Sequence, residues 1–366
     1  MDPHGPIAQR FPLVARFRPP CLPLPARVRG LGDLADTAVK KSDQGLASAV
    51  YNQAALIASD LDLPDLAREM CHRHAAAYLH ACPLPGMSAI RGLEPVVNLA
   101  RLQIRAGRTD KGRQRLLDLY AAVEAGTAAQ FEGVTVPADL TATDEDRHEV
   151  RAWLWRVLLA DGTRTLTTTG RWAEAKAHIE AHRGVGRRML DGRQVAVLAA
   201  LAAGDTAWAA VLLADTMPGD PWEQAVTACL TALCRRDAGQ PIDVLLADLV
   251  TAYCGREIEP GMTVFDIRLG LTVLDAIGSA EAPAARRIVE DLHRRTTEAQ
   301  DGYAARETLA HPLFTALATD RQAQDCRVLM RACALDTGTM PDELQRELTA
   351  ALRASDSVIW ESVARP

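Results

Sequence analysis

The composition of this 366-residue chain predicts an all-helical fold. Apolar residues make up 48% of the chain but aromatic residues only 4%, so the core must consist mainly of alanine, leucine and valine. Alanine and leucine favour helices, whereas strands prefer β-branched and aromatic residues. Charged residues make up 24%, which excludes a wholly disordered chain. The net charge of −6 argues against nucleic acid as a partner, because such binding needs a basic face.

The sequence also predicts a cytoplasmic protein with no membrane partner. No uncharged apolar stretch reaches the length of about 18 residues that marks a membrane-spanning helix. Arg16, Arg18 and many prolines interrupt the N-terminal region, so we expect no secretory signal. The eight cysteines form no C-x-x-C pair, and in a reducing cytoplasm we expect them to be buried free thiols. We expect no cofactor.

Residues 1–30 form a segment rich in proline and arginine. It contains seven prolines and five arginines against a single acid, Asp2. Because proline lacks a backbone donor and disrupts helix interiors, the segment is predicted to be an extended arm. It is either a disordered tail or a segment that docks on the acidic remainder of the chain or on a partner.

After this arm, a pattern of helix, tight turn and helix repeats along the chain. Three predicted turns contain glycines, Gly170, Gly204 and Gly239, which are 34 and 35 residues apart. Glycine supplies the left-handed backbone conformation that a Cβ disfavours. The six predicted turns lie in residues 61–69, 106–114, 169–177, 203–211, 238–246 and 278–286.

Residues at two fixed distances after each turn indicate how the paired helices pack. A small residue five positions after the turn lets two antiparallel helices approach closely, and an apolar residue nine positions after it is expected to face the neighbouring pair. The small residues are Ala67, Gly112, Ala175 and Ala209, with Val244 in the fifth turn and Ala284 one place later in the sixth. The apolar residues are Cys71, Leu116, Ile179 and Leu213.

This pattern resembles the tetratricopeptide repeat, most closely at GRWAEA, residues 170–175. The resemblance covers about residues 42–335 and implies a solenoid of α-α hairpins wound as a right-handed superhelix. Spacings of 45, 63 and 39 residues depart from the regular period, so we expect a degenerate repeat over residues 31–335. A capping helix, from about Pro341 to Ala354, and a tail are expected within residues 336–366.

The 63-residue spacing contains an insertion, residues 126–145. Within it FEGVTVPADL, residues 131–140, is the clearest β-type stretch and predicts a short hairpin or an ordered loop. The acids Asp144 to Asp146 predict the first turn of the following helix. Loops that interrupt a solenoid often border its binding surface.

The first helices of the predicted hairpins carry polar residues for which a core role is not expected. Four of them, from Glu94 to Arg105, fall at i, i+4, i+7 and i+11 and so share one helix face. Arginine suits a peptide carboxylate, because a guanidinium holds it with two charge-assisted hydrogen bonds. In residue type this surface resembles the carboxylate-clamping tetratricopeptide modules; the alternative is a solvated outer face with ion pairs along the helix. The candidate peptide-binding residues are Asn52, Glu94, Asn98, Arg101, Arg105, Arg147, Arg151 and Trp155.

A second group of residues is a candidate for chemistry: Cys71, His72, Arg73 and His74. Cys71 and His74 lie one helical turn apart, which allows a thiolate activated by an imidazole. Cys71 also occupies the packing position of its repeat, so core packing is the alternative. His178 and His182 share a helix face at i, i+4, as zinc ligands do, but no third ligand is in view and we expect no metal.

Charged residues also crowd the boundaries of the third hairpin. They either cap helices and link neighbouring repeats, or form a polar pocket beside the insertion. These residues are Asp161, Arg164, Arg187, Arg188, Asp191 and Arg193.

Three stretches, residues 52–74, 94–108 and 182–201, are similar to a group of actinobacterial helical-repeat proteins found beside enzymes that modify ribosomally made peptides. The similarity implies a precursor peptide or a modifying enzyme as partner and supplies no catalytic residues. The predicted function is a scaffold that binds a peptide or protein partner in a concave groove. One alternative is a lyase or cyclase that adds a cysteine thiol to a dehydrated peptide residue, with His72 or His74 as base. Another is a peptide-sensing regulator that has no DNA-binding domain of its own.

Overall fold

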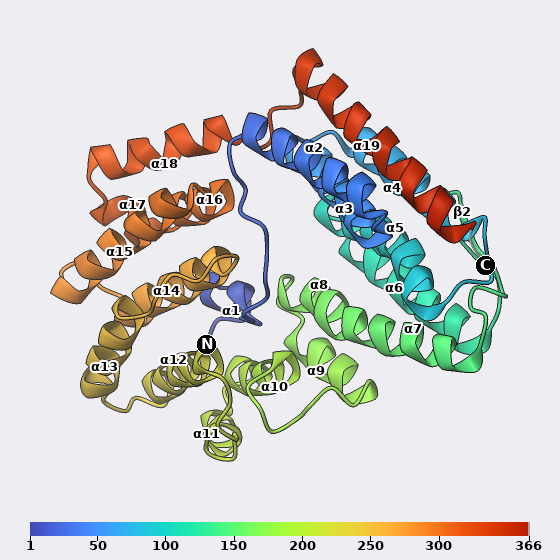
Figure 1. The fold of residues 1–366 in the computed structure, drawn as a ribbon. Coiled ribbons are helices and arrows are strands. Elements are labelled where there is room, and N and C mark those ends of the chain that lie inside the picture. Colours follow the sequence, from blue (N-terminus) through green and yellow to red (C-terminus); the bar gives the residue numbers. More distant parts are fainter. Residues whose placement is uncertain (365–366) are drawn as a thin grey trace. The chain divides into compact units, whose positions relative to one another are not determined.

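The computed structural model describes residues 1–364 and confirms an all-helical fold with one short β insertion (Figure 1). The chain divides into two compact units. Unit 1 comprises Met1–Pro23 and Leu166–Cys333, and unit 2 comprises Leu24–Thr165 and the chain from Ala334 onward. Each unit therefore combines segments that are far apart in the sequence.

Unit 2 consists of antiparallel helix pairs and the C-terminal helix. Its elements are α2 (Leu24–Lys41), α3 (Gln44–Asp60), α4 (Pro64–Leu79), α5 (Gly86–Arg105), α6 (Thr109–Ala125), β1 (Ala129–Phe131), β2 (Val134–Val136), α7 (Asp144–Val157), the π-helix η1 (Leu158–Gly162) and α19 (Asp342–Val363). The pairs α3–α4 and α5–α6 pack side by side, and α7 packs on α5 and α6. Because α19 packs on α2, α3 and α4, the last helix completes the core around the first ones.

Unit 1 continues the helix pairs. Its elements are α1 (Pro6–Arg10), α9 (Trp172–Ala181), α10 (Asp191–Ala202), α11 (Thr206–Ala214), α12 (Pro221–Asp237), α13 (Asp243–Cys254), α14 (Thr263–Ile277), α15 (Pro283–Ala299), α16 (Gly302–Leu309), α17 (Pro312–Leu317) and α18 (Asp320–Ala332). The short helix α8 (Thr163–Thr167) spans the boundary between the units. The pairs α10–α11, α12–α13, α14–α15 and α16–α18 each pack helix against helix, which is compatible with a helical repeat.

The six predicted turns are confirmed, since each contains the break between two consecutive helices. Gly170, Gly204 and Gly239 have φ values of +73°, +79° and +69°, where a side chain is disfavoured. The small residue after the turn is also needed: a Cβ on Gly112 would lie 2.5 Å from Cγ1 of Ile104. Close helix packing thus explains why glycine or alanine follows these turns.

The packing rule fails at the fifth and sixth turns. Val244 is 78% exposed, and Ala285 rather than Ala284 is the buried alanine of α15. The loops before α13 and α15 span residues 238–242 and 278–282, five residues each, whereas the loop before α11 has three. The longer loops shift the register of the second helix, so counting from the glycine misplaces the contact.

Three predicted boundaries differ from the structure. Helix α2 begins at Leu24, so the extended arm ends before residue 30; Pro25 is tolerated because it lies in the first helical turn. The β stretch forms a hairpin that starts at Ala129, with Phe131 paired to Val134. Helix α19 runs to Val363 rather than to residue 354, because its later turns are buried in the core of unit 2.

Two other predictions concern chemistry and environment. The eight cysteines are free thiols, as predicted; six of them are buried, whereas Cys82 and Cys254 are half-buried. None of the helices described for residues 1–364 is both long enough and apolar enough to cross a membrane.

Candidate functional site

The half-exposed polar residues of α3 and α5 form one continuous hydrogen-bond network in unit 2. Asn52 Nδ2 donates to Glu94 Oε2 at 2.6 Å, and Asn98 Nδ2 donates to Asn52 Oδ1 at 2.9 Å. Arg101 Nη1 donates to Asn98 Oδ1 at 2.9 Å, and its Nε donates to Asp161 Oδ2 of η1 at 2.9 Å. We call these five residues the Asn98 network; the predicted shared face of α5 is thereby confirmed for its first three members.

The Asn98 network keeps hydrogen-bond donors to spare. An asparagine amide carries two N–H groups and a guanidinium carries five. Asn98 uses one of its two, and Arg101 uses one on each nitrogen, which leaves one N–H on Asn98 and two on Arg101. The side chain of Arg101 is 49% exposed. Ordered donors at the surface are what an extended peptide backbone needs from its receptor.

A buried layer supports this network from below. Ser48 Oγ donates to Glu94 Oε2 at 3.2 Å and lies 2.9 Å from His74 Nε2. Burial raises the pKa of Glu94, against the hydrogen bonds from Asn52 and Ser48. Sequence reasoning missed Ser48, although it precedes Asn52 by four positions and therefore shares its helix face.

Arg105 lies outside the Asn98 network. Its Nη1 donates to Ser59 Oγ at 2.7 Å and to Asp60 Oδ1 at 3.1 Å, and Asp60 also pairs with Arg27 at 2.7 Å. The side chain of Asp60 is only 3% exposed. Because two arginines pair with this buried carboxylate, Arg105 holds the end of α3.

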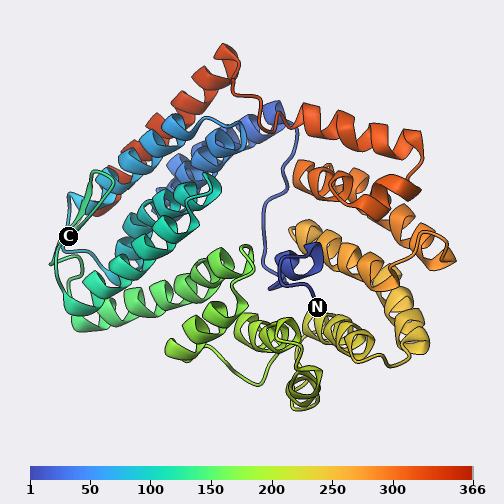
Figure 2. The ribbon, with the colours of Figure 1, turned by 180° about the vertical axis from the view of Figure 1, so that it is seen from behind.

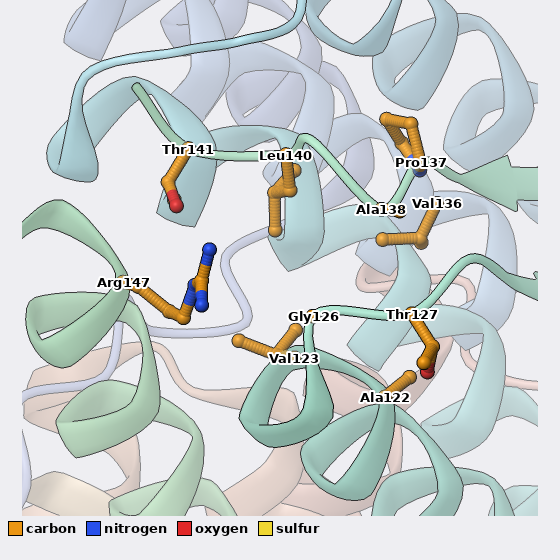
Figure 3. Close-up of a pocket in the computed structure, with 10 residues that line it drawn as sticks. All are labelled: Ala122, Val123, Gly126, Thr127, Val136, Pro137, Ala138, Leu140, Thr141 and Arg147. Atoms are coloured by element: carbon orange, nitrogen blue, oxygen red, sulfur yellow. The ribbon is translucent and has the colours of Figure 1, made fainter. Parts of the chain in front are cut away.

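The predicted residues on α7 lie outside the Asn98 network, and Arg147 is the one that lies beside the β insertion. Arg151 Nη2 donates to Glu124 at 2.6 Å, and Arg147 points into a small pocket that Val123 and Leu140 also line (Figure 3). The space there is no larger than about one water molecule. Trp155 is half-buried on the same helix. The pocket at Arg147 borders the insertion, but it is too small for a peptide side chain.

The cysteine–histidine group of α4 is part of the core. The His74 ring is stacked on Tyr51 with centroids 5.0 Å apart, and burial lowers its pKa to about 3. Burial likewise raises the pKa of Cys71 to about 12, so its thiol stays protonated near neutral pH. Arg73 pairs with Asp356 of α19 at 2.7 Å, and Nε2 of His72 is buried without a hydrogen-bond partner. His74 and Cys71 are therefore packed in the core, whereas the side chain of His72 is half-buried.

His178 and His182 do share a face at the end of α9. Their ring centroids are 4.5 Å apart, and His182 Nδ1 lies 2.9 Å from the carbonyl oxygen of His178. Within residues 1–364, no three histidine, cysteine or carboxylate side chains are arranged to hold a metal ion.

Most charged residues at the third-hairpin boundaries link neighbouring elements. Arg188 pairs with Asp220 at 2.9 Å and also with Glu223, and Arg193 donates to the carbonyl oxygen of Leu212 at 2.6 Å. Arg187 pairs with Asp215, whereas Asp161 belongs to the Asn98 network and Asp191 binds the arm. The linking interpretation is therefore the better one for Arg187, Arg188 and Arg193.

The N-terminal arm, here residues 1–23, belongs to unit 1 (Figure 2) and contacts helices α10, α14 and α16. Gln194 of α10 accepts a hydrogen bond from the backbone N–H of Leu13 and donates one to its carbonyl oxygen, each at 2.7 Å. Thr167 donates to the carbonyl oxygen of Phe11 at 3.2 Å. Farther along, the N–H of Gly302 donates to the carbonyl oxygen of Cys21 at 2.8 Å. The structure thus places the arm on the chain itself, which corresponds to the docked alternative.

Side-chain charges follow the same path. Arg10 pairs with Asp275 of α14, and Arg16 pairs with Asp191 of α10 at 2.8 Å. The guanidinium of Arg18 lies 4.1 Å from the ring centroid of Tyr303 on α16. We call the residues that bind the arm the arm-binding face: Thr167, Asp191, Gln194, Asp275, Gly302 and Tyr303.

Comparisons with family models, with curated proteins and with solved structures find no match to this chain. The fold itself defines the class, a protein of packed antiparallel helix pairs that is compatible with a helical repeat.

Proposed function

We propose that this protein is a tetratricopeptide-like scaffold that binds an extended peptide segment of a partner along the Asn98 network. The observation that carries the proposal is the set of spare N–H donors on Asn98 and Arg101, held in place by contacts to Asn52 and Asp161. Side chains fixed by their neighbours lose little conformational entropy on binding. A partner's backbone carbonyl oxygens are the acceptors that fit them.

The docked arm supports this proposal by analogy within the molecule. Gln194 satisfies both backbone groups of Leu13 with one amide side chain. Asn52 on α3 and Asn98 on α5 carry the same amide group, and each lies on the first helix of its pair. A repeat that binds its own extended segment through amide side chains is suited to bind another in the same way.

The charges favour a peptide backbone over a carboxylate as the ligand. Arg101 is already paired with Asp161 through Nε and Nη2, so a ligand carboxylate would have to displace it. Glu94 adds a second acid to the same network. Neutral or basic segments therefore suit the surface better than the acidic ligand that the arginines alone suggest.

The resemblance in the sequence names the partner class. We take it to be a precursor peptide, or an enzyme that modifies one, in a pathway of ribosomally made peptides. The thiol-adding lyase or cyclase is the weaker candidate, because His74, one of its two candidate bases, is buried and its pKa is lowered to about 3.

Selection from a displayed library of random linear peptides tests the proposal. Wild-type protein is used for selection, and Asn98→Ala/Arg101→Ala protein serves for comparison. We expect enriched peptides to bind wild type at least about tenfold more tightly, the loss of roughly one or two hydrogen bonds. Lys111→Glu, an exposed change on α6 of the same unit, should leave binding unchanged.

Two results contradict the proposal. Either no peptide is enriched, or the enriched peptides bind the Asn98→Ala/Arg101→Ala protein as tightly as wild type while circular dichroism reports equal helicity.

A further inference from the structure

The arm covers a side of unit 1 that its helices cannot cover themselves. Helix α10 is buried at every position from Gly192 to Leu201, and α14 is buried at most of its positions. A helix that is apolar all round needs contacts on every side, and α10 packs on α9, α11 and α12. The arm supplies the remaining contacts, so the arm-binding face is a surface built for a bound chain.

The arm binds this face as peptides bind receptors, through a few anchors in an extended chain. Phe11 is 0% exposed and Leu13 2% exposed, and they flank Pro12. Gln194 fixes the register, because it can pair with both backbone groups of only one residue at a time. Between the anchors and Cys21 the chain is less buried, and Phe17 is 71% exposed.

The arm-binding face is also selective for charge. Asp275 meets Arg10, and Asp191 meets Arg16. Burial opposes a charge on Asp275, yet its pKa is lowered by the hydrogen bond from His311 and by Arg10. Since the carboxylate is held ionised in a largely buried place, the face requires a cation at this point of the bound chain.

We propose that the arm-binding face is a receptor for basic extended segments of the pattern Arg-Phe-Pro-Leu-x-x-Arg-x-Arg, as in residues 10–18, and that a partner protein presenting such a segment displaces the arm. The arm is then a resident ligand. The tether to Leu24 gives it an effective concentration of about millimolar, so only a segment that binds well enters. This face shares no residue with the Asn98 network, and either proposal stands without the other.

Cutting the tether converts the resident ligand into a free one. A recognition sequence for a specific protease is inserted between Pro23 and Leu24, where no helix is interrupted. The full chain is purified, cleaved, and mixed with a synthetic peptide of residues 6–23 that carries a fluorophore at its C-terminal end. Anisotropy follows uptake of the probe, and mass spectrometry follows release of the cut arm.

We expect the cleaved protein to exchange its arm for the probe, and the uncut protein to take up the probe at least about 100-fold more weakly. A scrambled peptide of equal charge is the matched control and should not enter. Asp191→Arg should weaken the native probe about threefold, and a probe with Arg16→Asp should restore the loss, because both side chains are partly exposed.

Three outcomes overturn the proposal. The cut arm stays bound through a day in excess probe; the scrambled peptide enters as well as the native one; or cleavage itself unfolds unit 1, since a face that needs a covalent occupant cannot pass from one ligand to another.

Discussion

Truncating one anchor of the arm tests how much the arm stabilises unit 1. Leu13 is 2% exposed, and Leu13→Ala removes three buried carbons at about 0.8 kcal/mol each, about 2.4 kcal/mol of transfer free energy. The cavity left behind raises the cost to as much as about 5 kcal/mol. The backbone groups that bind Gln194 remain in the variant. A loss of 2.4 kcal/mol makes opening of the arm roughly 60-fold more frequent.

Hydrogen–deuterium exchange read by mass spectrometry separates this local effect from the rest of the chain. Peptides from the arm and from α10 should lose at least about 2 kcal/mol of opening free energy, whereas peptides from unit 2 should keep theirs. Phe17→Ala is the matched control: this side chain is 71% exposed, so its loss should cost less than about 0.5 kcal/mol. A Leu13→Ala effect below 0.5 kcal/mol, or one equal to that of Phe17→Ala, would refute the docked arm.

Three further changes probe the packing and the buried charges by urea unfolding. A Cβ on Gly112 would lie 2.5 Å from a side chain of α5, so Gly112→Ala should cost about 1–3 kcal/mol of unfolding free energy. Gly30→Ala, which has open space around it, should stabilise the protein by about 0.5–1 kcal/mol. Equal effects of the two changes would contradict the close approach of α6 to α5 at Gly112. Arg295→Leu removes the buried guanidinium that Asp266 and Asp291 share, so that each carboxylate keeps one arginine only, Arg256 or Arg294, and it should cost about 3–5 kcal/mol. Arg294→Leu, at a side chain 44% exposed, should cost less than about 1 kcal/mol; a small effect at both would rule out a buried pair. The pKa of His74 is about 3 in the folded protein, against 6.5 for an unperturbed histidine, so between these pH values only the unfolded chain binds the proton. The free energy of unfolding should therefore fall by about 3–5 kcal/mol as the pH drops from 6.5 to 3. If the His74→Phe variant shows the same dependence of unfolding free energy on pH, another group causes it.

The helix pairs could be predicted because their signals are local. A turn needs a residue at positive φ, and glycine at 170, 204 and 239 meets that need within the hairpin itself. The capping box of Thr143 and Asp146 likewise marks the start of α7 within four residues. What depends only on neighbours in sequence can be read from the sequence.

The division into units could not be predicted in this way. Helix α19 joins unit 2 through Tyr51 and Arg73, which both bind Asp356 some 280 to 305 residues away. These contacts have no period and no fixed spacing, and a solenoid in which each pair touches only the next predicts none of them. A repeat pattern in the sequence therefore cannot predict the packing of α19 against helices near the start of the chain.

The candidate site was predictable in part for the same reason. The i, i+4 and i+7 spacing of Glu94, Asn98 and Arg101 holds in the network, because a helix face is a local property. Their partner Asp161 comes from a π-helical turn sixty residues later, and the sequence places it only in a boundary cluster. The arginines on this face predict a carboxylate ligand, and in the structure Arg101 pairs with a carboxylate of the same chain, that of Asp161.

The arm illustrates how two weak signals combine into a strong one. DGRQVAVLAALA of α10 is apolar around most of its circumference, which by itself predicts only that the helix is covered. The arm is rich in proline and arginine, which by itself predicts only an extended basic segment. Helix α10 still has one side uncovered after α9, α11 and α12 pack on it. The arm is a basic segment of a chain whose net charge is negative. Taken together, the two signals predict that the arm covers the exposed side of α10, and the two hydrogen bonds between Gln194 and Leu13 lie at that contact.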